Sequence, residues 1–275
     1  MSEIFGSDAY APKQIAERVQ SVGVAKARLP LLAQFTLGIL AGGFIGLGAL
    51  YFMVVASDAN LGFAATRLLG GLAFSLGLIL VVIAGAELFT GNNLQVMAWA
   101  GGRITTVELL RSWLVIYVGN FIGALGLVLL VLWSRHWRMN GDAVGITAVK
   151  IAAAKVALPF WDAFFRGILC NILVCLAVWL ALAGRTVADK IIAIVFPISA
   201  FVAAGFEHSV ANMYFIPLGI FVQEQLPTPP LPTLNWAGLL SNLIPVTLGN
   251  VVGGGGMVAA VYYLVYCGRS DEPKR

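Results

Sequence analysis

Long uncharged apolar runs alternate with short charged stretches along the whole chain. Six of these runs are long enough to cross the hydrocarbon core of a bilayer, which takes about 20 residues of helix. Because lipid offers no hydrogen-bond partner to the backbone, each run is predicted to be a helix. The six runs are Leu31–Val55, Leu68–Ala100, Ser112–Trp133, Ala163–Ala183, Ile191–Val222 and Ala237–Cys267.

The composition is that of a membrane protein. Of the 275 residues, 60% are hydrophobic and only 11% are charged, whereas a soluble domain carries about 25% charged residues. The net charge of +4 comes without any basic run, so nucleic acid is not an expected partner. The three cysteines form no CxxC pair, and we expect neither a metal site nor another cofactor.

The runs divide the chain into three parts. Residues 1–30 are an N-terminal segment, residues 31–267 hold the six spans, and residues 268–275 are a short tail. Six spans place both termini on one side of the membrane. That side would hold 11 of the Lys and Arg residues against 6 on the other, so both termini are predicted to be cytoplasmic.

The N-terminal segment contains a predicted amphipathic helix from Pro12 to Arg28. Proline suits the first position of a helix, and Ile15, Val19 and Val22 fall on one face. We expect this helix to cap the bundle or to lie on the membrane surface. A role in gating is the alternative.

Two pairs of short motifs repeat at nearly the same offset. Gly38–Leu40 matches Gly167–Leu169 at 129 positions, and Gly119–Gly123 matches Gly249–Gly253 at 130. A repeat of three spans inserts its second copy upside down relative to the first. The pattern therefore predicts an all-α, six-span transmembrane bundle built as an inverted repeat of three plus three helices, with a solute site near the midplane of the bilayer.

Only three ionisable residues lie inside the apolar runs, namely Glu87, Glu207 and His208. Such groups are costly in lipid unless they face a cavity or a partner. The two glutamates lie in the second and fifth spans, and both spans exceed 30 residues. The residues of Thr90–Asn93 favour turns over the interior of a helix. We therefore expect the second and fifth spans to be interrupted near the centre.

The residues leave three classes of function open. A channel or transporter for a small solute explains the buried polar groups best. An intramembrane enzyme using Glu207 and His208 as an acid/base pair is the second class, but the chain has no HExxH, GxSxG or nucleotide-binding motif. A channel for neutral solutes is the third.

Four motifs resemble those of the formate/nitrite transporter family of bacterial inner-membrane channels. They are Ala86–Thr90, Gly167–Asn171, Gly205–Met213 and Asn242–Asn250. The resemblance implies an aquaporin-like fold with one pore in each subunit of a homopentamer. It also implies a small anion as substrate, most simply formate, with nitrite or hydrosulfide as alternatives.

The resemblance also implies roles for particular residues. His208 corresponds to the central pore histidine, Thr90 to the threonine that faces it, and Lys155 to a vestibule lysine beside Glu207. The remaining residues are polar partners of the histidine (Asn171 and Asn212), an outer apolar constriction (Phe74, Leu78 and Phe201) and an inner one (Leu88, Phe89 and Val174).

These residues suggest proton-linked passage. Burying an unpaired carboxylate costs far more than burying a neutral acid, and His208 could supply the proton. Passage as an anion beside a charged His208 is the alternative. The loop Gly91–Asn93 departs from the family pattern because it is richer in amides, so the resemblance does not extend to the gating of this chain.

Overall fold

The computed structural model describes residues 10–58, 60–227 and 229–268, and every regular element in these ranges is helical. The predicted tail 268–275, apart from Gly268, lies outside the described residues, as does the start of the N-terminal segment. The elements are α1 (Pro12–Ala27), α2 (Leu31–Ala56), α3 (Phe63–Ile79), η1 (Leu80–Gly85), η2 (Gly91–Gln95), α4 (Val96–Ala100), α5 (Thr106–Trp133), η3 (His136–Arg138), α6 (Ala143–Val156), α7 (Phe160–Ala183), α8 (Val187–Ala204), α9 (Ser209–Gln223), α10 (Trp236–Val251), η4 (Val252–Ala260) and α11 (Val261–Tyr266).

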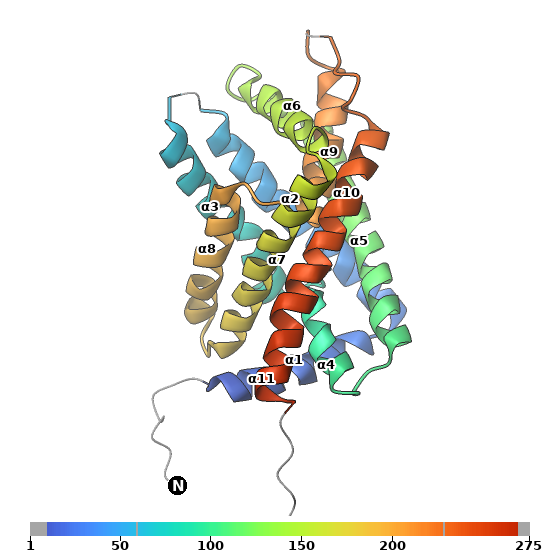
Figure 1. Ribbon diagram of the computed structural model, residues 1–275. Coiled ribbons are helices and arrows are strands. Elements are labelled where there is room, and N and C mark those ends of the chain that lie inside the picture. Colours follow the sequence, from blue (N-terminus) through green and yellow to red (C-terminus); the bar gives the residue numbers. More distant parts are fainter. Residues whose placement is uncertain (1–9, 59, 228, 269–275) are drawn as a thin grey trace, which may run out of the picture.

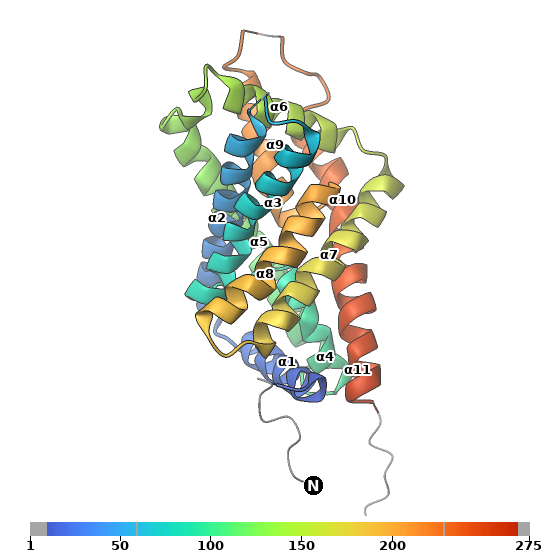
Figure 2. The same cartoon turned by 90° about the vertical axis from the view of Figure 1, so that its left-hand side faces the viewer.

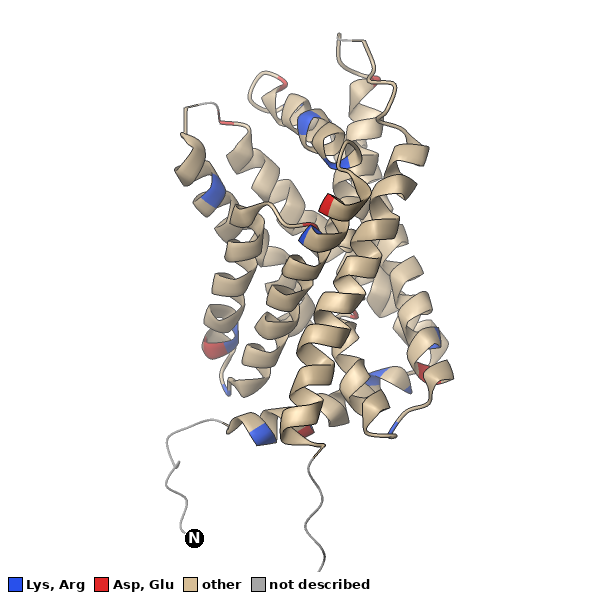
Figure 3. Ribbon diagram, in the orientation of Figure 1, with Lys and Arg blue, Asp and Glu red and all other residues tan. Residues whose placement is uncertain are grey.

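The described residues contain six helices that are long and apolar enough to cross a membrane, as the sequence predicts. They form a tall bundle, and α1 lies across one end of it beside α11 (Figures 1 and 2). Charged residues gather toward the two ends of the bundle, with long uncharged stretches between them (Figure 3). The six spans are Leu31–Ala56, Phe63–Gly85, Thr106–Trp133, Phe160–Ala183, Val187–Ala204 and Trp236–Tyr266.

The second apolar run of the sequence breaks in the middle. Helix α3 continues into the π-helical turn η1, which ends at Gly85 with a φ of 83°. Glycine adopts this left-handed conformation at little cost. An irregular stretch from Ala86 to Thr90 follows, and the chain then resumes in η2 and the short helix α4.

The fifth apolar run breaks in a similar way. Helix α8 ends at Ala204 and is capped by Gly205, whose φ of 73° turns the chain so that the N–H of Phe206 bonds back to the carbonyl of Phe201. The next residues are extended up to His208, and α9 begins at Ser209. Both long runs therefore hold an irregular segment where the sequence predicts an interruption.

Glycines let two pairs of spans pack at close range. A Cβ on Gly42 of α2 would overlap the carbonyl of Asn120 in α5, and a Cβ on Gly253 would overlap the carbonyl of Ile168 in α7. Small residues allow this approach, and dispersion then holds the helices together in lipid. In the sixth span, Pro245 lies inside α10, and the π-helical η4 follows this helix.

Candidate functional site

The irregular segment between α8 and α9 carries the buried Glu207. Its carboxylate lies 2.8 Å from the ammonium of Lys155, which belongs to α6. Asn212 donates from Nδ2 to Glu207 Oε2 at 2.7 Å and also to Asn242 Oδ1. Burying this carboxylate is tolerable because both of its oxygens have partners. Lys155 thus lies beside Glu207, and Asn212, which the resemblance places around the histidine, bonds to this glutamate.

The irregular segment after η1 carries Glu87 in an equivalent setting. Lys26 of α1 lies 3.0 Å from Glu87 Oε1 and also donates to Asn92 Oδ1 at 3.1 Å. Asn92 in turn donates to Glu87 Oε2 at 2.7 Å. Our sequence reasoning did not find Lys26. The signal was present, because Lys26 and Lys155 differ by the same 129 positions as Gly38 and Gly167.

Two asparagines fix the irregular segments in place. Asn120 donates to the carbonyls of Gly38 and Glu87, and its Oδ1 accepts the N–H of Phe89. Asn250 makes the corresponding bonds, to the carbonyls of Gly167 and Glu207 and from the N–H of Ser209. Each amide therefore satisfies backbone groups that a broken helix leaves without partners.

His208 and Thr90 bring the two irregular segments together. His208 Nε2 lies 2.8 Å from Thr90 Oγ1, and the N–H of Ala211 donates to His208 Nδ1 at 3.0 Å. Since Nδ1 accepts a hydrogen bond, the ring is neutral and carries its proton on Nε2, which donates to Thr90. The histidine is only 3% exposed and Thr90 is fully buried.

Asn171 lies near this pair but does not contact the imidazole. Its Nδ2 lies within hydrogen-bond distance of the Thr90 carbonyl, Asn93 Oδ1 and the Asn250 carbonyl. Asn212 bonds to the vestibule glutamate instead of His208. The two asparagines expected around the histidine therefore bond to residues next to it, Asn171 to the carbonyl of Thr90 and Asn212 to Glu207.

Two cavities lie next to the small chamber that His208 lines, and each shares lining residues with it. The first, which we call the Lys155 cavity, has a volume of about 380 Å³ and reaches Phe74, Phe201 and His208. The second, the Lys26 cavity, has about 370 Å³ and reaches Leu78 and Leu88. A chamber of about 10 Å³ lies between them, lined by Ile45, Phe74, Leu78, Leu88, Val174, Ile198, Phe201 and His208.

The apolar walls of this chamber include five of the six expected constriction residues. Phe74 and Phe201 pack edge to face at 5.6 Å on the Lys155 side. Leu78, expected at the outer constriction, borders the Lys26 cavity instead. Phe89 lines none of the three cavities described above and packs edge to face against Tyr117 at 4.9 Å.

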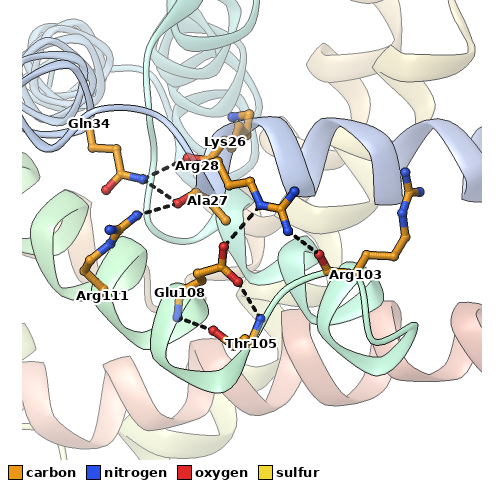
Figure 4. Close-up of polar contacts among 8 residues, drawn as sticks. All are labelled: Lys26, Ala27, Arg28, Gln34, Arg103, Thr105, Glu108 and Arg111. Atoms are coloured by element: carbon orange, nitrogen blue, oxygen red, sulfur yellow. Dashed lines mark hydrogen bonds and ion pairs between the residues drawn. The ribbon is translucent and has the colours of Figure 1, made fainter.

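Polar contacts fasten the end of α1 that carries Lys26 (Figure 4). Gln34 donates to the carbonyls of Lys26 and Ala27, and Arg111 also donates to Ala27. Arg28 donates to Glu108 and to the carbonyl of Arg103. The last carbonyls of a helix need such donors, so these side chains hold Lys26 against Glu87.

The described residues contain no group of three or more His, Cys, Asp or Glu side chains that could hold a metal ion. The lysines and glutamates of the site are paired with each other, and two arginines, Arg67 and Arg166, also line the Lys155 cavity. This chemistry suits the attraction and passage of a small anion.

A family model described as "Formate/nitrite transporter" matches residues 13–264. The chain belongs to this family. It is 39% identical to the formate channel FocA of Escherichia coli over 96% of this chain and 97% of that one. It is 40% identical to a probable formate transporter of Methanothermobacter thermautotrophicus, over 95% and 98% of the two chains.

A solved structure described as a pentameric formate channel with formate bound shares this fold. The TM-score is 0.80 at 41% identity, covering 86% of this chain and 97% of that one. The family consists of channels and transporters, and this member is a multi-pass membrane protein whose described residues hold six helices long and apolar enough to span the bilayer.

Proposed function

We propose that the protein is a channel for small monovalent weak-acid anions, with formate as the first substrate and His208 as the point where the proton is handled. The observation that carries this proposal is the arrangement along one path. His208, which bonds to Thr90, lines a small apolar chamber between two cavities, and each cavity contains a Lys–Glu pair.

The cavities and the chamber pose different physical problems for an anion. Lys26 and Lys155 can draw a carboxylate into the cavities, although each lysine already has a glutamate partner. The chamber offers apolar walls and a single polar side chain, that of His208. An unpaired carboxylate would lose far more solvation there than formic acid would, so the anion is expected to cross with a proton.

The resting state of His208 sets the order of proton steps. Because Nδ1 accepts from Ala211, the ring must first take up a proton, and at Nδ1 this breaks the Ala211 bond. The cationic ring then gives a proton to the carboxylate, so that an N–H bond breaks and an O–H bond forms. The ring becomes neutral again, and the acid deprotonates in the opposite cavity.

The chain architecture that we propose is an aquaporin-like inverted repeat. Two correspondences between the halves support it. Asn120 makes the same kind of hydrogen bonds in the first half as Asn250 does in the second. Lys26 likewise pairs with a glutamate in the first half as Lys155 does in the second. We further propose a homopentamer in the bacterial inner membrane with both termini in the cytoplasm. The pentameric relative supports this assembly, and the excess of Lys and Arg on the side that the sequence predicts for both termini supports this orientation.

Uptake into proteoliposomes tests the proposal. The purified protein would be offered formate, nitrite and hydrosulfide separately, from about pH 5 to about pH 8, the range in which histidine titrates. Formate uptake that rises on external acidification supports the proposal. Uptake of nitrite or hydrosulfide without formate would change the substrate, and flux of glycerol without any of the three anions would contradict an anion channel.

A further inference from the structure

The Lys155 cavity contains two arginines that the proposed mechanism does not use. Arg67 of α3 and Arg166 of α7 both line this cavity. Within residues 10–58, 60–227 and 229–268, neither guanidinium makes an ion pair or a hydrogen bond, and Arg67 has only a cation–π contact with Phe63 at 5.4 Å. Their hydrogen-bond donors are therefore available to a ligand.

Both arginines flank the irregular segment that carries Glu207. A Cβ placed on Gly205 would lie 3.9 Å from both terminal nitrogens of Arg67. The carbonyl of Arg166 accepts the N–H of Glu207 at 3.3 Å. The guanidinium of Arg67 and the backbone of Arg166 thus both lie beside the short stretch Gly205–Glu207, and both residues line the cavity that contains the Lys155–Glu207 pair.

No arginine is among the described residues that line the Lys26 cavity, although its volume is almost the same as that of the Lys155 cavity. Among the described residues that line it, Lys26 and Glu87 are the only charged ones, and they neutralise each other. The residue equivalent to Arg166 is Leu37, whose carbonyl accepts the N–H of Glu87 at 3.2 Å. The residue that accepts the glutamate N–H is therefore an arginine at the Lys155 cavity and a leucine at the Lys26 cavity.

The charge of the Lys155 cavity is correspondingly positive. Lys155, Arg67 and Arg166 face one carboxylate, that of Glu207, among the residues that line it. Asp162 lies one turn before Arg166 on α7, but it is exposed and does not line the cavity. A cavity of about 380 Å³ also exceeds what a three-heavy-atom carboxylate fills, so a second anion has space.

We infer that Arg67 and Arg166 form a second anion subsite in the Lys155 cavity, which takes one organic monoanion in front of the Lys155–Glu207 pair. This inference rests on the proposed function, because it assigns the binding of anions on one side of the same path. Guanidinium groups suit this ligand since their planar N–H donors match two oxygens of a carboxylate or sulfonate.

The subsite makes the channel asymmetric in binding. A passive channel has the same permeability in both directions at low substrate concentration, because it does not change the equilibrium between the two sides. The asymmetry must therefore appear as tighter binding of a blocking anion from one side of the membrane than from the other. An anion too large and too acidic to cross should block from the Lys155 side at lower concentration than from the Lys26 side.

Benzenesulfonate is a suitable probe because it stays ionised. Formate flux would be measured in spheroplasts and in inverted vesicles, which expose opposite faces, from a host without formate flux of its own. We expect half-block from the Lys155 side at a concentration about tenfold lower than from the Lys26 side, and the difference should shrink as salt screens the cavity.

Matched variants assign the effect to the two arginines. The double variant Arg67→Gln/Arg166→Leu should raise the half-blocking concentration on the Lys155 side about tenfold, whereas Arg166→Lys should retain most of the block. Lys150→Gln removes a nearby charge that does not line this cavity and should change nothing. Leu37→Arg should strengthen block from the Lys26 side.

A second readout does not depend on flux. Benzenesulfonate should raise the melting temperature of the purified wild-type assembly, since a ligand that binds only the folded state stabilises it, and the double variant should lose this shift. Equal block from both sides, unchanged by the double variant, would overturn the subsite. Absence of formate flux in the wild type would contradict the proposed function instead, while the thermal shift would still test the subsite.

Discussion

Lys26 and Lys155 occupy equivalent places in the two halves of the chain, 3.0 Å from Glu87 and 2.8 Å from Glu207. One lysine comes from a helix that lies across the end of the bundle and the other from α6. Each glutamate also accepts a hydrogen bond from an asparagine five residues later, Asn92 or Asn212. The same arrangement of lysine, glutamate and asparagine thus occurs twice in the chain.

Replacing either lysine by methionine should lower formate flux about tenfold or more, because the anion loses its cationic partner. Lys155→Met should also destabilise the protein by about 3–5 kcal/mol, since it leaves Glu207 buried without a counter-charge. The double variant Lys155→Met/Glu207→Gln should regain stability but not flux. Flux in vesicles and thermal unfolding measure the two effects, and full flux in Lys155→Met would contradict the role of the lysine.

Truncating Phe74 to alanine should open the chamber and let chloride leak through. Its ring closes the Lys155 side by packing on Phe201, and a hydrophobic constriction excludes ions only while it is narrow. Phe89→Ala is the matched control, because Phe89 lines none of the three cavities of the path. A chloride conductance in Phe89→Ala equal to that in Phe74→Ala would show that our account of the constriction is wrong.

Asn250→Ala should destabilise the protein by about 3 kcal/mol, because the amide makes three hydrogen bonds worth about 1 kcal/mol each. It should also lower flux, since the stretch around Glu207 loses its anchor. Ser241→Ala on the same helix removes only a bond to Gly238 within α10 and should have little effect. Thermal unfolding of both variants checks the difference.

Gly42→Ala should weaken the packing of α2 on α5 by about 1–3 kcal/mol, because the added methyl overlaps the Asn120 carbonyl. Gly126→Ala on α5 meets no atom within 4 Å and should be tolerated. Comparing the melting temperatures of the two variants tests the close approach. An equal melting temperature for both would mean that the helices can separate without cost.

The sequence was sufficient for the parts of the fold that depend on hydrophobicity alone. Six runs became six spans, and the costly Glu87 and Glu207 marked the two irregular segments. The role of Lys26 was not predicted, because only the apolar face of its helix was considered. Its partner, Glu87, comes close to it only because the second apolar run is interrupted. Applying the 129-residue offset to every lysine would have found it.

The orientation of side chains within the irregular segments could not be predicted. Leu88 and Phe89 are neighbours in the sequence, yet Leu88 lines the chamber and Phe89 points to Tyr117. A helix or strand has a period that assigns faces, but an irregular stretch has none. The direction of Phe89 depends on the bond from its N–H to Asn120, which lies 31 residues away.

The proton that accompanies formate past His208 is the central claim, and the luminal pH of proteoliposomes reports it most directly. After a formate gradient is applied, a trapped pH dye should show rapid acidification of the lumen with the wild type. His208→Asn should reduce this to the slow rate of empty liposomes. Formate entry that charges the membrane without acidifying the lumen would contradict the claim and show that the anion crosses alone.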